Sequence, residues 1–296
     1  MLSAMFGLLN IHKPPGPTSH DVVDQIRRRV GREVKVGHAG TLDPFAEGVL
    51  VICLGPATRL ADFVQAQPKR YLATVTLGAT SDTDDPTGQV TAVENAKAPP
   101  PDRVREVLAG FVGQIDQVPP AHSAVHVEGR RAYKLARAGK APDLAPRPVT
   151  VHSLELLSYA YPTLELNVSC GSGTYVRALA RDIGKVLGCG GYCSRLIRTA
   201  VGVFAIEQAV APEQVDPSRH LLPPVLALGD IPRVTLDAAS CGQLAKGRAV
   251  DLGCEQLRDV TPTGELAAMD EQERLVAIGR VSVDGATFRP DKVFAG

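Results

Sequence analysis

The stretch from residue 37 to residue 50 constrains this chain most, because it holds one carboxylate in a stiff turn just before an apolar strand. It reads Gly37-His38-Ala39-Gly40-Thr41-Leu42-Asp43-Pro44-Phe45-Ala46-Glu47-Gly48-Val49-Leu50. Its glycines allow backbone conformations closed to other residues, or a close approach to a ligand. Pro44 fixes the torsion after Asp43 and biases Asp43 toward an extended conformation. An Asp-Pro pair alone is a common turn signal, but this run is longer than a turn requires, and Asp43 is predicted to be a reactive group.

Five segments resemble, in the same order, motifs of the bacterial tRNA pseudouridine-55 synthases, the TruB family. The 37–50 stretch resembles the family's catalytic motif. The other four segments are Asn10-Ile11-His12-Lys13-Pro14-Pro15-Gly16-Pro17-Thr18-Ser19, Lys69-Arg70-Tyr71, Gly173-Thr174-Tyr175-Val176-Arg177 and Leu196-Ile197-Arg198-Thr199. The resemblance covers nearly the whole chain and weakens past about residue 230. It implies a pseudouridine synthase that acts on tRNA.

Length and hydropathy are consistent with a soluble enzyme. A chain of 296 residues exceeds the usual size of a single core, so one large domain and one small domain are expected. The hydrophobic content is 44% and the mean hydropathy is +0.01. No apolar run approaches the roughly 20 residues of a membrane span, and the first residues lack the basic start of a signal peptide. We therefore expect a cytoplasmic protein with no membrane partner.

Six cysteines, at positions 53, 170, 189, 193, 241 and 254, are scattered without a Cys-x-x-Cys pair. In a long cytosolic chain this pattern indicates reduced, mostly buried thiols. Cys189 and Cys193 could supply two ligands of a zinc site, but no matching His or Cys pair accompanies them. The sequence therefore predicts no metal site.

The net charge is zero, but the charges are unevenly distributed. Two segments are basic: 126–148, with Arg130, Arg131, Lys134, Arg137, Lys140 and Arg147, and 27–35, with Arg27, Arg28, Arg29, Arg32 and Lys35. These side chains are candidate phosphate contacts, although solvated helix faces also produce charge runs. The acids gather late, at Asp251, Glu255, Asp259, Glu265, Asp270, Glu271 and Glu273.

Local patterns predict alternating helices and strands. Thr18 and Asp21 resemble a capping box for a helix over 19–30. Further helices are predicted at 102–111 and 176–187, and strands at 48–54, 71–77, 89–93 and 164–170. The turn-rich stretch 81–88 contains Asp82, Asp84 and Asp85, which we interpret as a structural loop near the substrate, although three close acids also suit a hard cation.

The resemblance implies an α/β (α+β) pseudouridine synthase fold with a mixed, largely antiparallel central sheet and a small C-terminal β-rich domain of the PUA type. We expect the catalytic domain to span 1–229 and the C-terminal domain 230–296. Residues 119–148 resemble the mobile basic thumb that closes over the T-arm of tRNA. His122 and His126 stand where the family commonly carries Tyr and Lys, which puts individual contacts of the thumb in question. Short strand signals and an Asp284-Gly285 hairpin signal support a β-rich C-terminal domain.

Arg177 lies in the first turn of a predicted helix, where a cation opposes the helix dipole unless an anion lies in front of it. Helix geometry alone also allows a surface arginine that reaches into water. The resemblance implies that Arg177 pairs with Asp43 and keeps it ionised. The preceding Gly171-Ser172-Gly173 could cradle a phosphate, but it lacks the Gly-Lys-Ser/Thr ending of a P-loop.

Isomerising uridine breaks the N1-glycosidic bond, turns the uracil and joins C5 to C1′, which requires no cofactor. It does require a dry pocket and a carboxylate, which Asp43 supplies. A base inside a folded T-loop must first be flipped out, at a cost of about a few kcal/mol.

The resemblance implies that Tyr71 stacks on the flipped base, although a strand tyrosine can also simply pack in a core. It further implies that Tyr175 and Leu196 line the pocket and that His38 fills the space that the base vacates. Lys13 is expected to brace the Asp43 loop.

The predicted function is therefore isomerisation of uridine-55 in the T-loop of tRNAs, by base flipping and an aspartate-dependent exchange of the glycosidic bond. Whether Asp43 attacks the base or the sugar stays open. The partner is the T-arm of tRNA, and we expect a monomer without an obligatory protein partner. The alternatives are a non-catalytic tRNA-binding or folding module on the same scaffold, and a nucleoside hydrolase.

Overall fold

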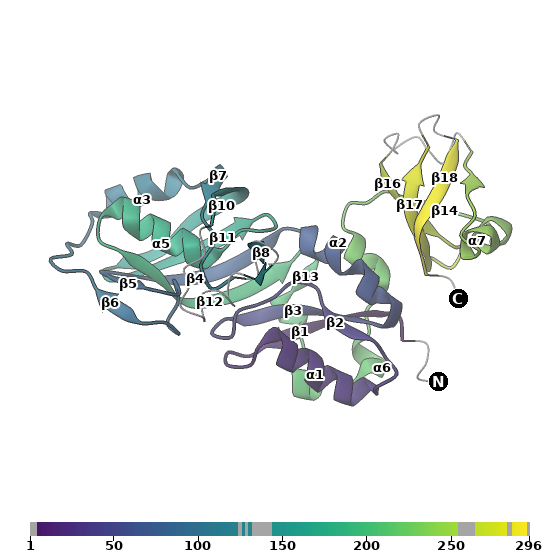
Figure 1. Cartoon of the computed structure of the whole chain (residues 1–296), viewed down its shortest axis with the longest axis horizontal. Coiled ribbons are helices and arrows are strands. Elements are labelled where there is room, and N and C mark those ends of the chain that lie inside the picture. The colour runs from purple at the N-terminus through teal and green to yellow at the C-terminus, as the bar shows by residue number, and fades with distance from the viewer. Residues whose placement is uncertain are drawn as a thin grey trace.

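The computed structural model describes residues 5–123, 126–127, 130–131, 144–253, 264–282 and 286–294. Figure 1 shows an extended sheet with helices along it and a separate small sheet near the C-terminus. Within those ranges, no helix is long and apolar enough to cross a membrane.

A nine-stranded sheet forms the larger body. Seven strands follow one another in the order β1-β3-β12-β4-β11-β10-β7, while β2 pairs with β3 and β13 with β12. The strands are β1 (Gly7–Lys13), β2 (Val36–His38), β3 (Glu47–Leu54), β4 (Lys69–Leu77), β7 (Gly113–Gln117), β10 (Arg147–Ala160), β11 (Thr163–Cys170), β12 (Gly191–Val201) and β13 (Phe204–Ala205). Among the described strands of this sheet, only β3 and β12 pair in parallel. The predicted mixed, largely antiparallel sheet is therefore confirmed.

The predicted strands at 48–54, 71–77 and 164–170 are β3, β4 and β11. The sequence pattern did not predict β12, although it lies at the centre of the sheet. One reason is that Arg198 occupies an inward position on this strand and is only 3% exposed, where period-2 patterning expects an apolar side chain.

Helix α1 (Ser19–Val30) forms as predicted, with a complete capping box. The Asp21 N–H donates to the Thr18 hydroxyl at 3.1 Å, and the Thr18 N–H donates to the Asp21 carboxylate at 2.8 Å. The buried face of α1, which includes Val22 and Ile26, packs against β1 and β3. The capping box fixes where the helix begins, and Thr18, Ser19 and His20 at this helix start line the pocket described below.

Two further helices pack on the half of the sheet that contains β4 and β11. Helix α5 (Val176–Leu187) ends at Gly188, whose φ of 75° closes the last turn, and α3 (Pro101–Ala109) lies beside it. Their buried residues form one cluster with β4 and β11. The predicted helices at 176–187 and 102–111 are confirmed, the second with slightly shifted ends.

Short elements connect these parts of the larger body. They are the 3-10 helices η1 (Gly55–Leu60), η2 (Ile206–Gln208), η3 (Pro212–Gln214) and η4 (Pro224–Leu228), the helices α2 (Ala61–Ala66) and α6 (Pro217–His220), and the hairpin of β5 (Ala79–Ser81) with β6 (Val90–Ala92). The turn-rich stretch 81–88 connects β5 to β6, and β6 corresponds to the strand predicted at 89–93.

The C-terminal part is β-rich, as expected. Five strands in the order β14-β16-β17-β18-β15 form its sheet, and α7 (Ala238–Ala245) packs against it. The strands are β14 (Arg233–Thr235), β15 (Val250–Asp251), β16 (Glu265–Met269), β17 (Leu275–Val281) and β18 (Thr287–Val293). The boundary at residue 229 stays a prediction, as does the PUA type. The Asp284-Gly285 signal, Glu255 and Asp259 lie outside the described residues.

An aromatic contact joins the C-terminal sheet to the larger body. The rings of Phe294 and Phe6 stack at 5.3 Å, nearly parallel at 11°. The guanidinium of Arg59 lies 5.0 Å from the centre of the Phe294 ring, and its Nη1 donates to the Val293 carbonyl at 2.6 Å. The two sheets are therefore held together by stacking and by a cation over the same ring.

The predicted thumb, 119–148, is described only in part. β8 (His126–Val127) pairs antiparallel with β9 (Arg130–Arg131). Lys134, Arg137 and Lys140 lie outside the described residues. The phosphate contacts predicted for this segment stay a prediction.

Candidate active site

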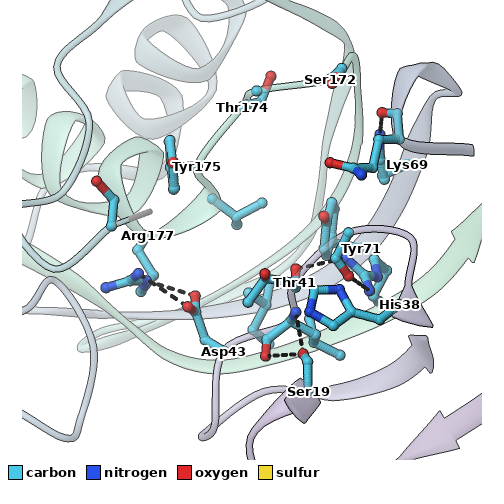
Figure 2. A pocket seen from close by; sticks show the side chains of 18 of the residues that line it. Ser19, His38, Thr41, Asp43, Lys69, Tyr71, Ser172, Thr174, Tyr175 and Arg177 are labelled. Carbon is cyan, nitrogen blue, oxygen red and sulfur yellow. Dashed lines mark hydrogen bonds and ion pairs between the residues drawn. The ribbon is translucent and has the colours of Figure 1, made fainter. Parts of the chain in front are cut away.

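A cavity of about 810 Å³ lies between the Asp43 loop, β4 and the start of α5 and is open to solvent. Figure 2 shows Asp43, Tyr71, Tyr175, Arg177 and His38 around it. A cavity of this size falls in the range of small-molecule sites and accommodates a single nucleoside. The sequence-predicted site residues therefore converge on one place, although Lys13 lies behind the wall rather than in it.

Backbone contacts hold the Asp43 loop. The hydroxyl of Ser19, the first residue of α1, accepts from the Leu42 N–H and donates to the Leu42 carbonyl, both at 2.9 Å. On the other side of Asp43, the Pro44 carbonyl accepts from the Gly16 N–H at 2.7 Å. The side chain of Asp43 is 31% exposed, so it remains accessible from the pocket while its backbone is fixed. This is a preorganised carboxylate.

Arg177 binds Asp43 with two parallel hydrogen bonds. Nε lies 2.9 Å from Oδ2, and Nη2 lies 3.2 Å from Oδ1 (Figure 2). Arg177 is only 3% exposed, so the alternative of a surface arginine reaching into water is wrong. The anion expected in front of this helix start is present. Such a fork fixes both the position and the orientation of the carboxylate.

The remaining donors of Arg177 are also occupied. Nη1 donates to Asp85 Oδ2 at 3.0 Å and to the Thr83 carbonyl at 2.7 Å, and Nη2 donates to the His122 carbonyl at 3.1 Å. All five N–H groups of the guanidinium therefore have acceptors. A fully bonded guanidinium cannot turn away from Asp43 without breaking several contacts at once.

Asp85 is a site residue that the sequence analysis did not single out. It is 4% exposed, and its Oδ1 accepts from Thr83 Oγ1 at 2.8 Å and from the Thr87 N–H at 2.9 Å. The neighbouring Asp84 instead pairs with Arg181 at 2.8 Å, and burial raises the pKa of Asp84 to about 6. The turn at 81–88 is therefore structural, as interpreted, and it also supplies a second carboxylate to Arg177.

Two buried cations brace the loop from behind. Lys13 is fully buried and donates to the carbonyls of Pro14 and Ala46, both at 2.8 Å, while burial lowers its pKa to about 8. Arg198, which the sequence analysis did not single out, is 3% exposed and donates to the Val49, Thr41 and Gly40 carbonyls at 2.7, 3.2 and 3.3 Å. Both cations thus donate to backbone carbonyls on either side of Asp43 and hold the backbone of the loop in place.

Two family models match consecutive parts of the chain. The model for the TruB family pseudouridylate synthase N-terminal domain matches residues 27–176, and that for the tRNA pseudouridylate synthase B C-terminal domain matches 177–221. The chain belongs to the TruB family. It is similar to tRNA pseudouridine synthase B of Syntrophomonas wolfei subsp. wolfei, with 42% identity over 90% of this chain and 93% of the relative. The enzyme of that name from Dehalococcoides mccartyi (strain 195) is 38% identical over 98% and 97%.

Solved structures show the same fold. The chain superposes on a chain of the crystal structure of a Cbf5-Nop10-Gar1 complex with a TM-score of 0.75 and 26% identity, covering 98% of this chain and 85% of the other. The pseudouridine synthase fold predicted for this TruB-family chain is therefore confirmed.

The aromatic and apolar residues predicted for the TruB-type pocket line it. Tyr71 on β4 is 8% exposed, and burial raises its pKa. It belongs to the core cluster and also lines the pocket, while its stacking on a flipped base stays a prediction. Leu196 on β12 is buried beside it. Tyr175 precedes α5, and Gln117 holds it by accepting from its N–H at 2.8 Å and donating to its carbonyl at 3.1 Å.

His38 ends β2 and lines the pocket. Its Nδ1 is buried and has no hydrogen-bond partner in the described part of the chain. Burial and the nearby charge of Arg198 lower the pKa of His38, so the ring is neutral near pH 7. A neutral ring is suited to filling space beside a base.

Among the described residues, no group of three or more His, Cys, Asp or Glu side chains is arranged to hold a metal ion. Cys189 and Cys193 are both buried, and burial raises the pKa of both thiols. A thiol must lose its proton to bind zinc, so this environment disfavours the two-cysteine zinc site considered from the sequence.

Proposed function

We propose that this chain isomerises uridine 55 in the T-loop of tRNA to pseudouridine. Its membership of the TruB family and its similarity to proteins named tRNA pseudouridine synthase B support the reaction class, an isomerisation. The observation that carries the proposal is the carboxylate of Asp43, which faces a cavity of nucleoside size while Arg177 holds both of its oxygens.

In the proposed reaction, Asp43 acts on the flipped uridine, either on the base or on C1′ of the sugar. The N1–C1′ bond breaks, the uracil turns, C5 bonds to C1′, and C5 gives up its proton while N1 gains one. Atoms therefore balance without a cofactor. Arg177 keeps the carboxylate ionised and directed at the nucleoside.

The other pocket residues bind and confine the base. Tyr71 stacks on the uracil, and its raised pKa keeps the phenol neutral. Leu196 and Tyr175 complete the wall that keeps the detached base from leaving. His38 fills the space that the flipped base leaves in the T-loop, and Lys13 holds the Asp43 loop in position.

We infer a monomeric cytoplasmic enzyme that needs no obligatory protein partner and whose thumb, 119–148, closes over the T-arm. The C-terminal domain, 230–296, contributes less phosphate binding than is usual for such a module, since acids are frequent in it.

The decisive experiment incubates the purified protein with an unmodified tRNA transcript and maps pseudouridine by a chemistry specific to that nucleoside. Pseudouridine at position 55 supports the proposal, and its absence refutes it. Tight tRNA binding without product would instead indicate a non-catalytic binding or folding module. Release of free uracil would indicate a hydrolase. The Asp43–Arg177 geometry favours the isomerase over the binding module, because a binding module needs no preorganised carboxylate.

A further inference from the structure

Lys69, at the start of β4, is a buried cation that the proposed chemistry leaves without a role. It is 9% exposed and lines the cavity. Residues of β4 alternate in burial, so Lys69 and Tyr71 share the inward face while Arg70 is exposed on the other. Figure 2 shows Lys69 on the side of the pocket that carries Tyr71, away from the Asp43–Arg177 pair.

No carboxylate of the described residues forms an ion pair with Lys69. Its Nζ donates to the Gln65 carbonyl, and none of the ion pairs in the described part of the chain includes it. Burial lowers its pKa to about 8, and the neighbouring positive charge of Arg198 contributes in the same direction. A buried ammonium without an anion is unfavourable. An anion that entered the pocket beside Lys69 would compensate this charge.

The surroundings of Lys69 place that anion near the mouth of the pocket. Lys69 pairs in register with Cys170, the last residue of β11, and the loop that follows also lines the cavity. In that loop Ser172 is exposed, and the N–H groups of Ser172 and Gly173 have no acceptor within the described residues. Gln65, on the other side, is also exposed. An anion at this rim would therefore meet one ammonium and unpaired amide donors.

We propose that Lys69 binds the phosphodiester adjacent to the flipped uridine, an inference that rests on the proposed function. A flipped nucleotide stays attached to its RNA chain, so its phosphates remain near the mouth of the pocket while the base enters. Phosphodiesters are the anions that every RNA carries. Lys69 would thus fix the register of the RNA backbone, and Tyr71, two residues further on the same face, would meet the base.

The test combines protein variants with a T-arm stem-loop RNA in which the phosphate on either side of the target uridine is replaced by a neutral methylphosphonate. The proteins are the unmodified chain, Lys69→Met, Lys69→Arg and the matched control Arg70→Met, which removes an exposed cation from the opposite face of β4. Affinity is measured at several salt concentrations, with thermal unfolding of each variant as a check on folding.

We expect Lys69→Met to weaken binding of the fully charged RNA by about tenfold and to flatten the salt dependence by about one slope unit. Lys69→Arg should restore most of the affinity, and Arg70→Met should have no effect. With the methylphosphonate at the contacted position, Lys69→Met and the unmodified protein should bind alike, because the two changes remove the same contact.

Equal RNA affinities of Lys69→Met and Arg70→Met would overturn the inference. It would also be overturned if the loss of affinity caused by Lys69→Met and the loss caused by the neutral linkage were additive. If Lys69→Met fails to fold, the test compares the affinity of the unmodified protein for the fully charged RNA and for the two methylphosphonate RNAs. Equal affinity for all three RNAs would reject the phosphate contact. The proposed function fails separately, when the unmodified protein forms no pseudouridine in any tRNA.

Discussion

Asp43 and Arg177 lie 134 residues apart in the sequence and meet through two hydrogen bonds, Nε to Oδ2 at 2.9 Å and Nη2 to Oδ1 at 3.2 Å. The arginine is buried, and the aspartate faces the cavity. The buried guanidinium therefore has carboxylate partners in both Asp43 and Asp85, while the Asp43 carboxylate stays accessible from the cavity. Each end of this pair can be tested on its own.

Asp43→Asn keeps the size of the side chain but removes its charge and its nucleophilicity. We expect tRNA to bind with nearly unchanged affinity while pseudouridine formation falls to background. The control is Asp62→Asn, which changes an exposed carboxylate in the first turn of α2. Formation of pseudouridine by Asp43→Asn at a rate near that of the unmodified protein would show that the active-site assignment is wrong.

Arg177→Ala should slow turnover strongly, because Asp43 then lacks the group that orients it. The change also leaves Asp85 buried without its cation, which should destabilise the fold by about 3–5 kcal/mol. The effects of the two substitutions on turnover should not add: once Asp43 is Asn, losing Arg177 should cost little further activity. Single-turnover rates of both variants and of the double variant measure this coupling, and additive losses would argue that the residues act independently.

Asp85→Asn tests the second carboxylate. The two carboxylate oxygens of Asp85 accept from Arg177 Nη1 and from the Thr87 N–H. Asn replaces one of these oxygens by an NH₂ group, which cannot accept, so at least one buried donor loses its partner. We expect about 1–3 kcal/mol lower stability in urea unfolding, with turnover reduced at least about tenfold. Asp116→Asn, on the exposed face of β7, serves as the control. Unchanged turnover in Asp85→Asn would limit Asp85 to a structural role.

The sequence predicted Asp43 because glycines and a proline around one acid are a local signal. It predicted the Arg177 pairing only through the family resemblance, since no local pattern connects positions 43 and 177. Asp85 could not be singled out from Asp82 and Asp84, because the side chain that faces Arg177 depends on a turn in which Asp84 adopts a positive φ of 60°.

The two buried cations Arg198 and Lys69 illustrate a second limit. Strand periodicity identifies inward positions by their apolar side chains, so a charged residue on that face is assigned outward. Both residues are nevertheless buried, because backbone carbonyls accept their hydrogen bonds. Every residue has a backbone carbonyl, so the sequence does not show which carbonyls will accept these hydrogen bonds.

Chelation provides a test that does not depend on any single side chain. Pseudouridine formation needs no redox step, and no group of three potential ligands is gathered among the described residues. We expect activity to survive EDTA as long as the tRNA is kept folded by monovalent salt. Activity that is lost on chelation and restored specifically by zinc would contradict this expectation. Melting curves of the tRNA under the same conditions separate a folding effect on the RNA from an effect on the protein.

The pH dependence of stability should report on His38. Its pKa in the folded protein is lowered below the ordinary value of 6.5 by burial and by the charge of Arg198. Well above pH 6.5 the ring is neutral in both the folded and the unfolded chain, so His38 adds no pH dependence there. As the pH falls below 6.5, the unfolded chain binds a proton first, and the stability contributed by the neutral ring is lost as the pH passes through the folded pKa.

Replacing His38 by Asn should therefore flatten the decline in the free energy of unfolding that sets in as the pH falls below 6.5. His152→Asn, which changes an exposed histidine on β10, should leave the decline as it is. Urea unfolding at half-unit pH steps measures all three proteins. If His38→Asn follows the same curve as the unmodified protein, the ring is not buried neutral in the folded state. The space-filling role proposed for it would then have to allow for a charged imidazolium beside the RNA.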